Sequence, residues 1–302
     1  MSRKNDPPAG ATDVTDADRR HPHRAFDPAL IADFLGGREV RAAKLLPGGK
    51  TNSNYRLRLS SGEECVLRLL SRGDSSREAH VLSLARAFVP APQVLAIGDG
   101  WLALEYVDGR PLQHTRDDLR LAGQALARIH SLRFDRAGWI EPDASVTPFH
   151  FPDGDFTSTM LARDDVRGWL GEALAEDVAR LMQRTAHLRD GLSDPRLVHG
   201  DFNASNLLVR DGRLAAVLDW EFAHAGTRWM DVGNLLRHLP LALRRYVREG
   251  LEAGGAVVPA DWQARAELVD LSSALEFLTS GRSDAFRREC VTRVRRVVAH
   301  LA

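Results

Sequence analysis

Short runs of alternating apolar and polar residues fill the first third of the chain, and this pattern predicts β-strands. The runs are EVRAAKLL (39–46), NYRLRLS (54–60), ECVLRLL (64–70), QVLAIGD (93–99) and WLALEYV (101–107). A helical pattern interrupts them, since Val81, Leu82 and Ala85 recur at helical spacing. A shorter amphipathic helix is expected over 26–37, with Leu30, Ile31 and Phe34 on one face. We therefore expect a small β-rich N-lobe with one main helix, over residues 25–107.

Helical periodicity dominates after residue 108. Thr115 precedes a run with Leu119, Ala122 and Leu126 on one face, and Ser283 precedes a final helix with Cys290 and Val294 on its stripe. A further helix is expected over 171–188, whereas 138–170 show no period and are rich in aromatic residues. Asp211-Gly212 predicts the turn of one hairpin, NLLVRDGRLAAVLDW. The pattern predicts an α+β fold whose larger C-lobe, 108–302, is mainly α.

The N-terminal segment, residues 1–24, is polar and punctuated by Pro and Gly, so we expect a disordered tail. Its His21 and His23 are interpreted as solvated side chains, not as a metal site. The segment lacks the apolar stretch of a secretory signal, and the sequence has no apolar run of the ~18–20 residues that cross a membrane. Both observations favour a cytoplasmic protein without a membrane partner.

Charge and cysteine content narrow the possible functions. The chain has 302 residues with 41 Lys+Arg against 41 Asp+Glu, and a balanced charge does not favour nucleic-acid binding. The two cysteines, Cys65 and Cys290, fall on apolar faces and are expected to be buried thiols. Lysine occurs only at Lys4, Lys44 and Lys50, so no mechanism can use a lysine further along the chain. The sequence leaves the oligomeric state open.

The stretch PGGKTNSNYRL (47–57) resembles the end of a Walker A loop. The full motif requires a Gly at position 44, where the chain has Lys44, and a helix after the loop, where the pattern is that of a strand. A nucleotide-binding loop of the Walker type is therefore excluded. What remains is a Gly-rich turn between two strands.

An oxygen-rich constellation follows an apolar run later in the chain. In LVHGDFNASNLLV, Asp201 precedes Asn206 by five residues, and Asp219 follows after the predicted hairpin. Carboxylate and amide oxygens suit Mg²⁺, which usually also takes water and substrate phosphates as ligands. The order His-x-Asp-x4-Asn, strand, Asp is that of a kinase catalytic loop and its metal-binding Asp.

These motifs resemble those of the aminoglycoside phosphotransferase/choline kinase family of small-molecule kinases. The hallmark His-Gly-Asp-x4-Asn starts at His199, and REAHVL, LALEYVDGRPL, LARIHSL and GTRWMDVGNLLRH are similar to further family segments. The resemblance covers roughly residues 40–300. It implies a bilobal protein-kinase-like fold and transfer of a phosphoryl group from ATP to a hydroxyl of a small molecule, without naming that acceptor.

The resemblance also implies roles for individual residues. Asp201 would orient the acceptor hydroxyl and take its proton, while Asn206 and Asp219 would hold Mg²⁺. The backbone of Glu105, Tyr106 and Val107 would meet the adenine at the hinge between the lobes. Asp231 would brace the loop through backbone hydrogen bonds.

Two positions depart from the kinase pattern. The third strand usually supplies a lysine for the α- and β-phosphates, and here Arg68 stands at that place. A guanidinium can bind phosphate oxygens in a bidentate manner, and Lys50, with Gly48 and Gly49 in the Gly-rich turn, is a second candidate. Gly200 stands where protein kinases have Arg, which argues against a kinase gated by phosphorylation.

Glu78 has two interpretations: the end of a Ser75-x-x-Glu78 capping box, or the ion-pair partner of Arg68. Asn203 is expected either to hydrogen-bond within its loop or to contact phosphate or metal, and His199 to pack within the loop. Residues Trp139, Phe149, Phe151 and Trp169 are interpreted as core rather than as a substrate platform.

An acidic stretch between residues 249 and 276 is typical of a solvated face, the alternative being a surface for a cationic substrate. It contains Glu249, Glu252, Asp261, Glu267, Asp270 and Glu276.

Two other functions stay open. A pseudokinase that binds nucleotide as an interaction module is supported by the missing lysine. A metal-dependent hydrolase built on His199 and Asp201 is disfavoured, because no second His lies at a suitable spacing.

Overall fold

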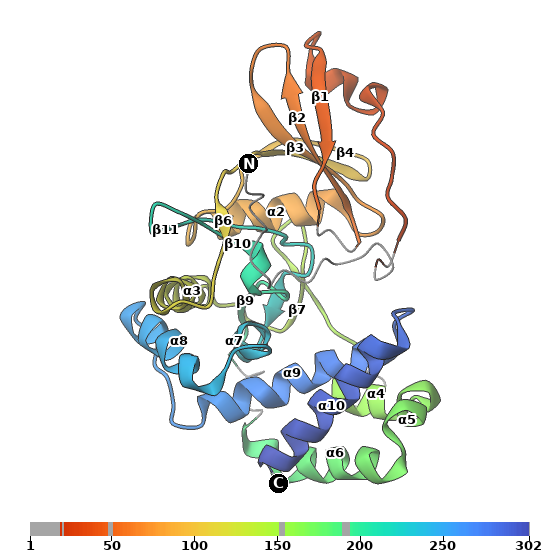
Figure 1. Cartoon of the computed structure of the whole chain (residues 1–302), viewed down its shortest axis with the longest axis vertical. Coiled ribbons are helices and arrows are strands. Elements are labelled where there is room, and N and C mark those ends of the chain that lie inside the picture. The colour runs from red at the N-terminus through yellow and green to blue at the C-terminus, as the bar shows by residue number, and fades with distance from the viewer. Residues whose placement is uncertain (1–18, 20, 48–50, 151–154, 189–193, 302) are drawn as a thin grey trace, which may run out of the picture.

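The computed structural model describes residues 19, 21–47, 51–150, 155–188 and 194–301. A β-rich part formed by the first hundred residues lies above a larger helical part (Figure 1). This is the α+β architecture that the sequence predicts. Among the described residues, no helix combines the length and the apolar character needed to cross a membrane.

The upper part is a five-stranded antiparallel sheet with strand order β1-β2-β3-β5-β4. The strands are β1 (Val40–Leu45), β2 (Ser53–Leu59), β3 (Glu64–Leu69), β4 (Val94–Gly98) and β5 (Trp101–Glu105). Helix α2 (Ser75–Ala85) is inserted between β3 and β4. Side chains alternate between the two faces of each strand. Cys65, Leu67 and Leu69 therefore join one core cluster, and Val66, between Cys65 and Leu67, packs against the cluster that contains residues of α2.

The segment before β1 closes the first of these two clusters. A 3₁₀ turn (Pro28–Ile31) leads into α1 (Ala32–Leu35), and Gly36 ends the helix with φ +55°. Ile31 and Leu35 are the buried residues, whereas Leu30 is exposed, which corrects the predicted face. The turn shifts from 3₁₀ to α geometry at Ile31, so the spacing of a regular helix does not describe it.

The predicted tail also requires correction at its end. Arg24 donates from its guanidinium to the carbonyl oxygens of Leu70 (2.5 Å) and Gly100 (3.2 Å). Its backbone N–H donates to Ser53 Oγ (2.9 Å). Residue 24 is thus part of the packed structure, held by backbone acceptors that no local sequence pattern reveals.

The lower part contains eight helices within the described residues. They are α3 (Arg116–Ile129), α4 (Phe156–Leu161), α5 (Asp164–Leu170), α6 (Glu172–Arg184), α7 (Trp229–Leu236), α8 (Leu241–Ala253), α9 (Trp262–Leu278) and α10 (Asp284–Leu301). Thr115 caps α3 and Ser283 accepts a hydrogen bond from the first turn of α10, as expected. Cys65 and Cys290 are buried free thiols.

Two small sheets were not anticipated in the lower part, where one hairpin was expected. The hairpin itself is present as β10 (Leu207–Arg210) and β11 (Arg213–Val217), with positive φ at Asp211 and Gly212. It gains a third strand, β6 (Arg110–Pro111). The second sheet comprises β7 (Gly138–Ile140), β8 (Val146–Pro148), β9 (Arg196–Val198) and β12 (His224–Gly226). The prediction of an irregular segment over 138–170 is wrong, because this segment contains β7, β8, α4 and α5. Strands of three residues and helices of six and seven residues are too short to show a clear period.

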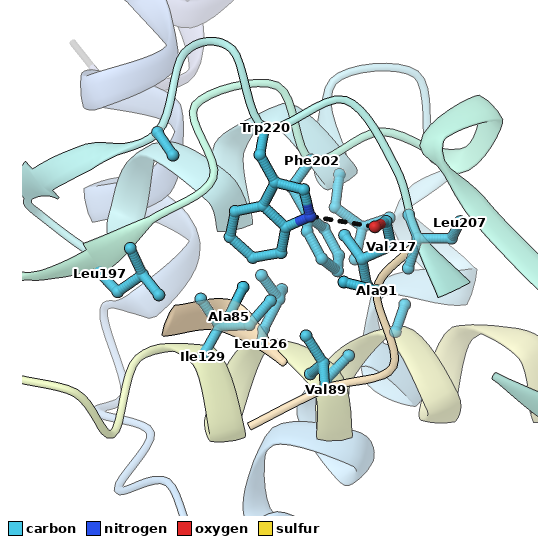
Figure 2. Packing of buried hydrophobic residues seen from close by; sticks show 14 of the residues in the cluster. Ala85, Val89, Ala91, Leu126, Ile129, Leu197, Phe202, Leu207, Val217 and Trp220 are labelled. Carbon is cyan, nitrogen blue, oxygen red and sulfur yellow. Dashed lines mark hydrogen bonds between the residues drawn. The ribbon is translucent and has the colours of Figure 1, made fainter. Parts of the chain in front are cut away.

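The main core cluster runs through both parts of the molecule. Trp220 packs at its centre with Ala85 from α2 and with Leu126 and Ile129 from α3 (Figure 2). The indole Nε1–H of Trp220 donates to the carbonyl oxygen of Val217 (3.0 Å). This core fixes the end of the hairpin, and with it the position of Asp219.

Candidate active site

The segment 199–206, named here the HGD loop, joins β9 to β10 and presents Asp201 between two amide side chains. Asn203 Nδ2 donates to Asp201 Oδ1 (2.9 Å), and Asn206 Nδ2 donates to Asp201 Oδ2 (3.1 Å). Asn206 Nδ2 also reaches the carbonyl oxygen of Asp201 (2.9 Å). Burial, and after it the charge of Asp219, raises the pKa of Asp201. The structure thus holds a single oriented carboxylate with enhanced basicity.

Asn203 belongs to the loop's internal hydrogen bonds. Besides its bond to Asp201, its Oδ1 accepts from the backbone N–H of Ser205 (3.1 Å), which caps the short 3₁₀ turn Ala204–Asn206. Of the two interpretations from the sequence, hydrogen bonding within the loop is the one that the geometry favours.

Asp231, at the start of α7, holds the HGD loop from below. Its carboxylate is completely buried and accepts from the backbone N–H groups of His199 and Gly200, both at 2.9 Å. It also lies 2.9 Å from Nε2 of His130. Burial alone would raise the pKa of Asp231, but these interactions outweigh it and the net shift is downward. The carboxylate is therefore a charged anchor for the loop.

His199 links the HGD loop to the segment that carries Asp219. Its Nε2 donates to the carbonyl oxygen of Leu218 (2.7 Å), and its Nδ1 accepts from the N–H of Asp201 (3.2 Å). These partners require the neutral ring with the proton on Nε2. The ring is buried and packs 4.6 Å from the ring of Trp220. His199 is thus a packed linker between two candidate site residues.

Gly200 is required by its backbone and by its neighbour. Its φ is +84°, a region that favours glycine, and a Cβ there would lie 2.5 Å from the carbonyl oxygen of Phe222. This contact explains physically why no arginine, or any side chain, stands at this position.

Asp219 follows the hairpin with φ +65°, in the left-handed region. Arg68 Nη2 donates to its Oδ1 at 2.6 Å. The same guanidinium lies 3.2 Å from Glu78 Oε1 and 3.8 Å from Glu221 Oε2. Arg68 is only 4% exposed, so one buried cation contacts three carboxylates, one from α2 and two from the segment 219–221. The expected pair of Arg68 with Glu78 is present.

The interpretation of Ser75 and Glu78 as a capping box is wrong. Asp74 caps α2 by accepting from the N–H of Ser76 (2.8 Å), and Ser75 Oγ donates to the carbonyl oxygen of Gly98. Glu78 points to Arg68 instead, but without a hydrogen bond between them. Burial raises the pKa of Glu78 to about 7 against the opposing effect of Arg68. Asp219, which accepts the hydrogen bond, is therefore the principal partner of Arg68.

Glu221 and Asn52 are site residues that the sequence reasoning missed. Asn52 Nδ2 donates to Glu221 Oε2 (2.8 Å), and Asn52 Oδ1 accepts from the N–H of Ser71 (3.0 Å). The signal available was the position of Glu221 two residues after Asp219. Asn52 lies in the same turn as Gly48, Gly49 and Lys50, and those three predicted residues lie outside the described part of the chain.

The predicted hinge residues differ in how far their backbone groups are hydrogen-bonded, since the N–H of Glu105 donates to the carbonyl oxygen of Gln93 (2.8 Å). Glu105 pairs with Cys65 at the end of β5, and the ring of Tyr106 stacks 3.9 Å beneath the guanidinium of Arg56. Within the described residues, no backbone hydrogen bond involves Tyr106 or Val107. The backbone groups of Tyr106 and Val107 are thus unpaired in the part of the chain that the structure describes.

The acidic stretch is not a negatively charged surface. Each of its members with an assigned partner is paired with an arginine, and the pairs are Glu249–Arg120, Glu252–Arg248, Asp261–Arg265, Glu267–Arg244 and Asp270–Arg237. Glu252 and Glu276 are exposed, as expected for a solvated face, and Glu249 is half-buried, whereas Glu267 and Asp270 are mostly buried in their ion pairs. Most of their partners come from other helices, which a linear reading of charges does not show.

Asn206 and Asp219 fit a Mg²⁺ ion by the chemistry of their donors. The amide nitrogen of Asn206 is committed to Asp201, so its Oδ1 is available, and the Asp219 side chain is 28% exposed. One carboxylate and one amide oxygen suit an ion that completes its shell with water and phosphate. Among the described residues, no three His, Cys, Asp or Glu side chains gather as a metal-holding group.

The fold and this arrangement of Asp201, Asn206 and Asp219 define a protein-kinase-like phosphotransferase. Residues 42–268 match the phosphotransferase enzyme family, so the chain belongs to that family.

Solved structures share the fold over almost their whole length. A protein assigned as a fructosamine-3-kinase from Thermobifida fusca is 24% identical, with a TM-score of 0.69 over 91% of this chain and 100% of its own. Macrolide 2'-phosphotransferase MphH from Brachybacterium faecium is 17% identical, with a TM-score of 0.62 over 89% and 98%. Aminoglycoside phosphotransferase APH(4)-Ia, in a complex with ADP and hygromycin B, is 20% identical, with a TM-score of 0.63 over 90% and 97%.

Proposed function

We propose that this enzyme transfers the γ-phosphoryl group of ATP to a hydroxyl group of a small molecule, with Mg²⁺ as cofactor. The observation that carries the proposal is the Asp201 carboxylate, oriented by Asn203 and Asn206 and made more basic by burial beside Asp219. Similar structures support the substrate class, because their names include fructosamine, macrolide and aminoglycoside kinases. A cytoplasmic location is part of the proposal.

In the proposed reaction, Asp201 accepts a hydrogen bond from the acceptor hydroxyl and directs its oxygen at the γ-phosphorus. The new oxygen–phosphorus bond forms while the bond to the β,γ-bridging oxygen breaks, and ADP leaves. The hydroxyl proton passes to the Asp201 carboxylate, whose raised pKa favours proton uptake. Mg²⁺, held by Asn206 and Asp219, supplies neutralisation of phosphate charge.

Arg68 has a different proposed role from the lysine it replaces. Its hydrogen bond to Asp219 and its contact with Glu78 position the metal-binding carboxylate relative to β3 and α2. The backbone of Glu105, Tyr106 and Val107 is proposed to bind the adenine. Lys50, Gly48 and Gly49 are proposed to cover the phosphates.

The first test is ADP release from Mg-ATP across a panel of hydroxylated metabolites and antibiotics, with Asp201→Asn beside the wild type. We expect one compound class to stimulate release and the substitution to lower kcat by about 100- to 10,000-fold. Asp117→Asn, an exposed aspartate on α3, is the matched control and should keep full activity. Full activity of Asp201→Asn on a good acceptor would refute the assigned mechanism.

The second candidate function is a nucleotide-binding interaction module. It is favoured by the commitment of Arg68 to Asp219, since the guanidinium occupies a carboxylate oxygen that would face the metal. Tight binding of Mg-ATP without turnover of any acceptor in the same panel would support it.

A further inference from the structure

A recess in the lower part of the molecule is lined by more positive than negative side chains. It has a volume of ≈ 270 Å³ and lies between the end of α7, the start of α8, and the helices α9 and α10. The charged side chains in its wall are Arg237, Arg244, Arg293 and Arg296, against Glu267 and Asp270. Four guanidinium groups thus face two carboxylates. Asp201, Asn206 and Asp219 are not part of this wall, so the recess is separate from the candidate active site.

The two carboxylates are shared and cannot neutralise all four arginines. Asp270 accepts from Arg237 Nη2 (2.6 Å) and from Arg293 Nη2 (2.7 Å). Glu267 accepts from Arg244 Nη1 (2.5 Å) and contacts His300 Nδ1 (2.9 Å). Arg296 forms no ion pair within the described residues.

The buried arginines show the effect of this surplus. Burial, and after it the charge of Arg237, lowers the pKa of Arg293, although Asp270 partly offsets both. Burial opposes ionisation of Arg237 too, but there Asp270 outweighs it and the net pKa shift is upward. Asp270 and, to a smaller extent, Asp201 offset burial at Arg237, whereas Asp270 does not fully offset burial at Arg293. A second anion would relieve this imbalance.

Arg244 carries an unsatisfied donor in the same wall. The side chain is 6% exposed, and its Nε has no hydrogen-bond partner among the described residues. That Nε is itself closed off from solvent, so Arg244 contributes positive charge to the wall and not a free donor.

The start of α8 adds backbone donors. Leu241, the first residue of this helix of 13 residues, lines the recess, and no side chain caps the helix. The first N–H groups of a helix have no partner within the helix, and its dipole places positive potential there. Helix starts of this kind bind phosphate and similar anions.

From the surplus of four arginines over two carboxylates and the uncapped start of α8 at one recess, we propose a binding site there for a small phosphate-bearing dianion. A planar guanidinium fork matches phosphate oxygens, and the recess holds a group of that size. The site also contacts the HGD loop indirectly. Arg237 Nη2 donates to Asn234 Oδ1 (2.5 Å), and Asn234 Nδ2 donates to the carbonyl oxygen of Gly200 (3.1 Å).

The test is calorimetric titration of the full chain with inorganic phosphate at about pH 8, where phosphate is mainly a dianion. We expect one site in the wild type, and Arg296→Gln to weaken it by about five- to tenfold. Arg295→Gln is the matched control, because Arg295 is exposed on the same helix and does not line the recess. It should bind phosphate as the wild type does.

A second variant keeps the test independent of the buried pairs. Leu241 is 66% exposed and lines the recess, so Leu241→Asp adds a negative charge at its mouth without disturbing the core. We expect phosphate affinity to fall at least about tenfold, by repulsion and loss of the helix-start site. Equal affinity of the wild type, Arg296→Gln and Leu241→Asp would overturn the proposal. So would a wild-type Kd weaker than about 10 mM.

A parallel titration with glycerol phosphate tests whether the site prefers a phosphomonoester or free phosphate. Tighter binding of glycerol phosphate than of inorganic phosphate would assign the site to phosphomonoesters, and the reverse order to free phosphate. Neither titration requires turnover, so failure of the proposed kinase activity leaves this result unaffected.

Discussion

At the scale of single residues, the site depends on acceptors that are buried and charged. Asp231 accepts two backbone N–H groups and contacts His130 while being completely buried. An aspartate in this place sets the path of the HGD loop without touching a substrate. Its role is positional, and the same is true of His199.

Asp231→Asn tests this role. An amide in that place turns one N–H toward the N–H groups of His199 and Gly200, so a buried donor is left unpaired. We expect the free energy of unfolding to fall by about 2–4 kcal/mol, together with a large loss of kcat. Urea denaturation at neutral pH provides the measurement.

Asp117→Asn is the control for that experiment as well, and its stability should stay within about 0.5 kcal/mol of the wild type. An Asp231→Asn enzyme as stable as this control would show that the carboxylate does not anchor the loop.

At the scale of elements, helices α3 and α8 approach so closely that only glycine fits between them. A Cβ on Gly250 would lie 2.3 Å from the carbonyl oxygen of Arg120 and 2.9 Å from Cα of Gly123. A Cβ on Gly123 would lie 2.3 Å from the carbonyl oxygen of Val247. Two glycines in facing turns therefore set the distance between the two helices.

Gly250→Ala is expected to lower the free energy of unfolding by about 1–3 kcal/mol, because backbone atoms on both sides must move apart. Chemical denaturation of the two proteins side by side measures the change.

Gly168→Ala in α5 is the matched control, since a Cβ there meets nothing within 4 Å. Alanine is the better helix former, so this variant should gain up to about 1 kcal/mol. If both substitutions stabilise the protein, the close approach of α3 and α8 does not require glycine at position 250.

Sequence patterns predicted the elements whose signals are local. The order of Asp201, Asn206 and Asp219, the strand that carries Arg68 and the caps at Thr115 and Ser283 all follow from spacing within a few residues. The two small sheets, the Asn52–Glu221 contact and the pairs of Asp270 with Arg237 and Arg293 do not. The side-chain pairs join residues 23 to 169 positions apart, and the strands of the sheets have only two to five residues. Neither period nor propensity contains that information. The cap at Asp74 shows a further limit, because Ser75 and Glu78 satisfy the motif but have stronger partners elsewhere.

At the scale of the whole molecule, the upper sheet and the lower helical part are joined by polar contacts at the candidate site. Arg68 binds Asp219, Asn52 binds Glu221, and Arg77 on α2 donates to both carboxylate oxygens of Glu141. Together with the core around Trp220, these contacts fix the two parts relative to each other (Figure 2).

The pKa of Glu78 makes its contact with Arg68 dependent on pH. Its folded pKa of about 7 lies above the ordinary value of 4.5, so the folded protein binds more protons between these values. Its contribution to stability is therefore greatest at low pH and declines as pH rises through this window. We expect Glu78→Gln to gain in free energy of unfolding, relative to the wild type, between pH 5 and about pH 8. Urea denaturation at the two pH values measures the gain.

Glu276→Gln, at an exposed position on α9, is the control. Its free energy of unfolding should change between the two pH values as that of the wild type does. If the free energy of unfolding of Glu78→Gln also changes with pH as that of the wild type does, Glu78 is ionised throughout the window.

The restriction of lysine to Lys4, Lys44 and Lys50 has a practical consequence for protein chemistry. Every positive side chain in the lower part is a guanidinium, so residues 51–302 contain no primary side-chain amine. A protease that cleaves after lysine leaves this whole stretch as one fragment. An amine-reactive dye attaches only to the chain's start, to β1 through Lys44 or to the turn that follows β1. Fluorescence from such a dye would report on the sheet alone, because the helical part would carry no label.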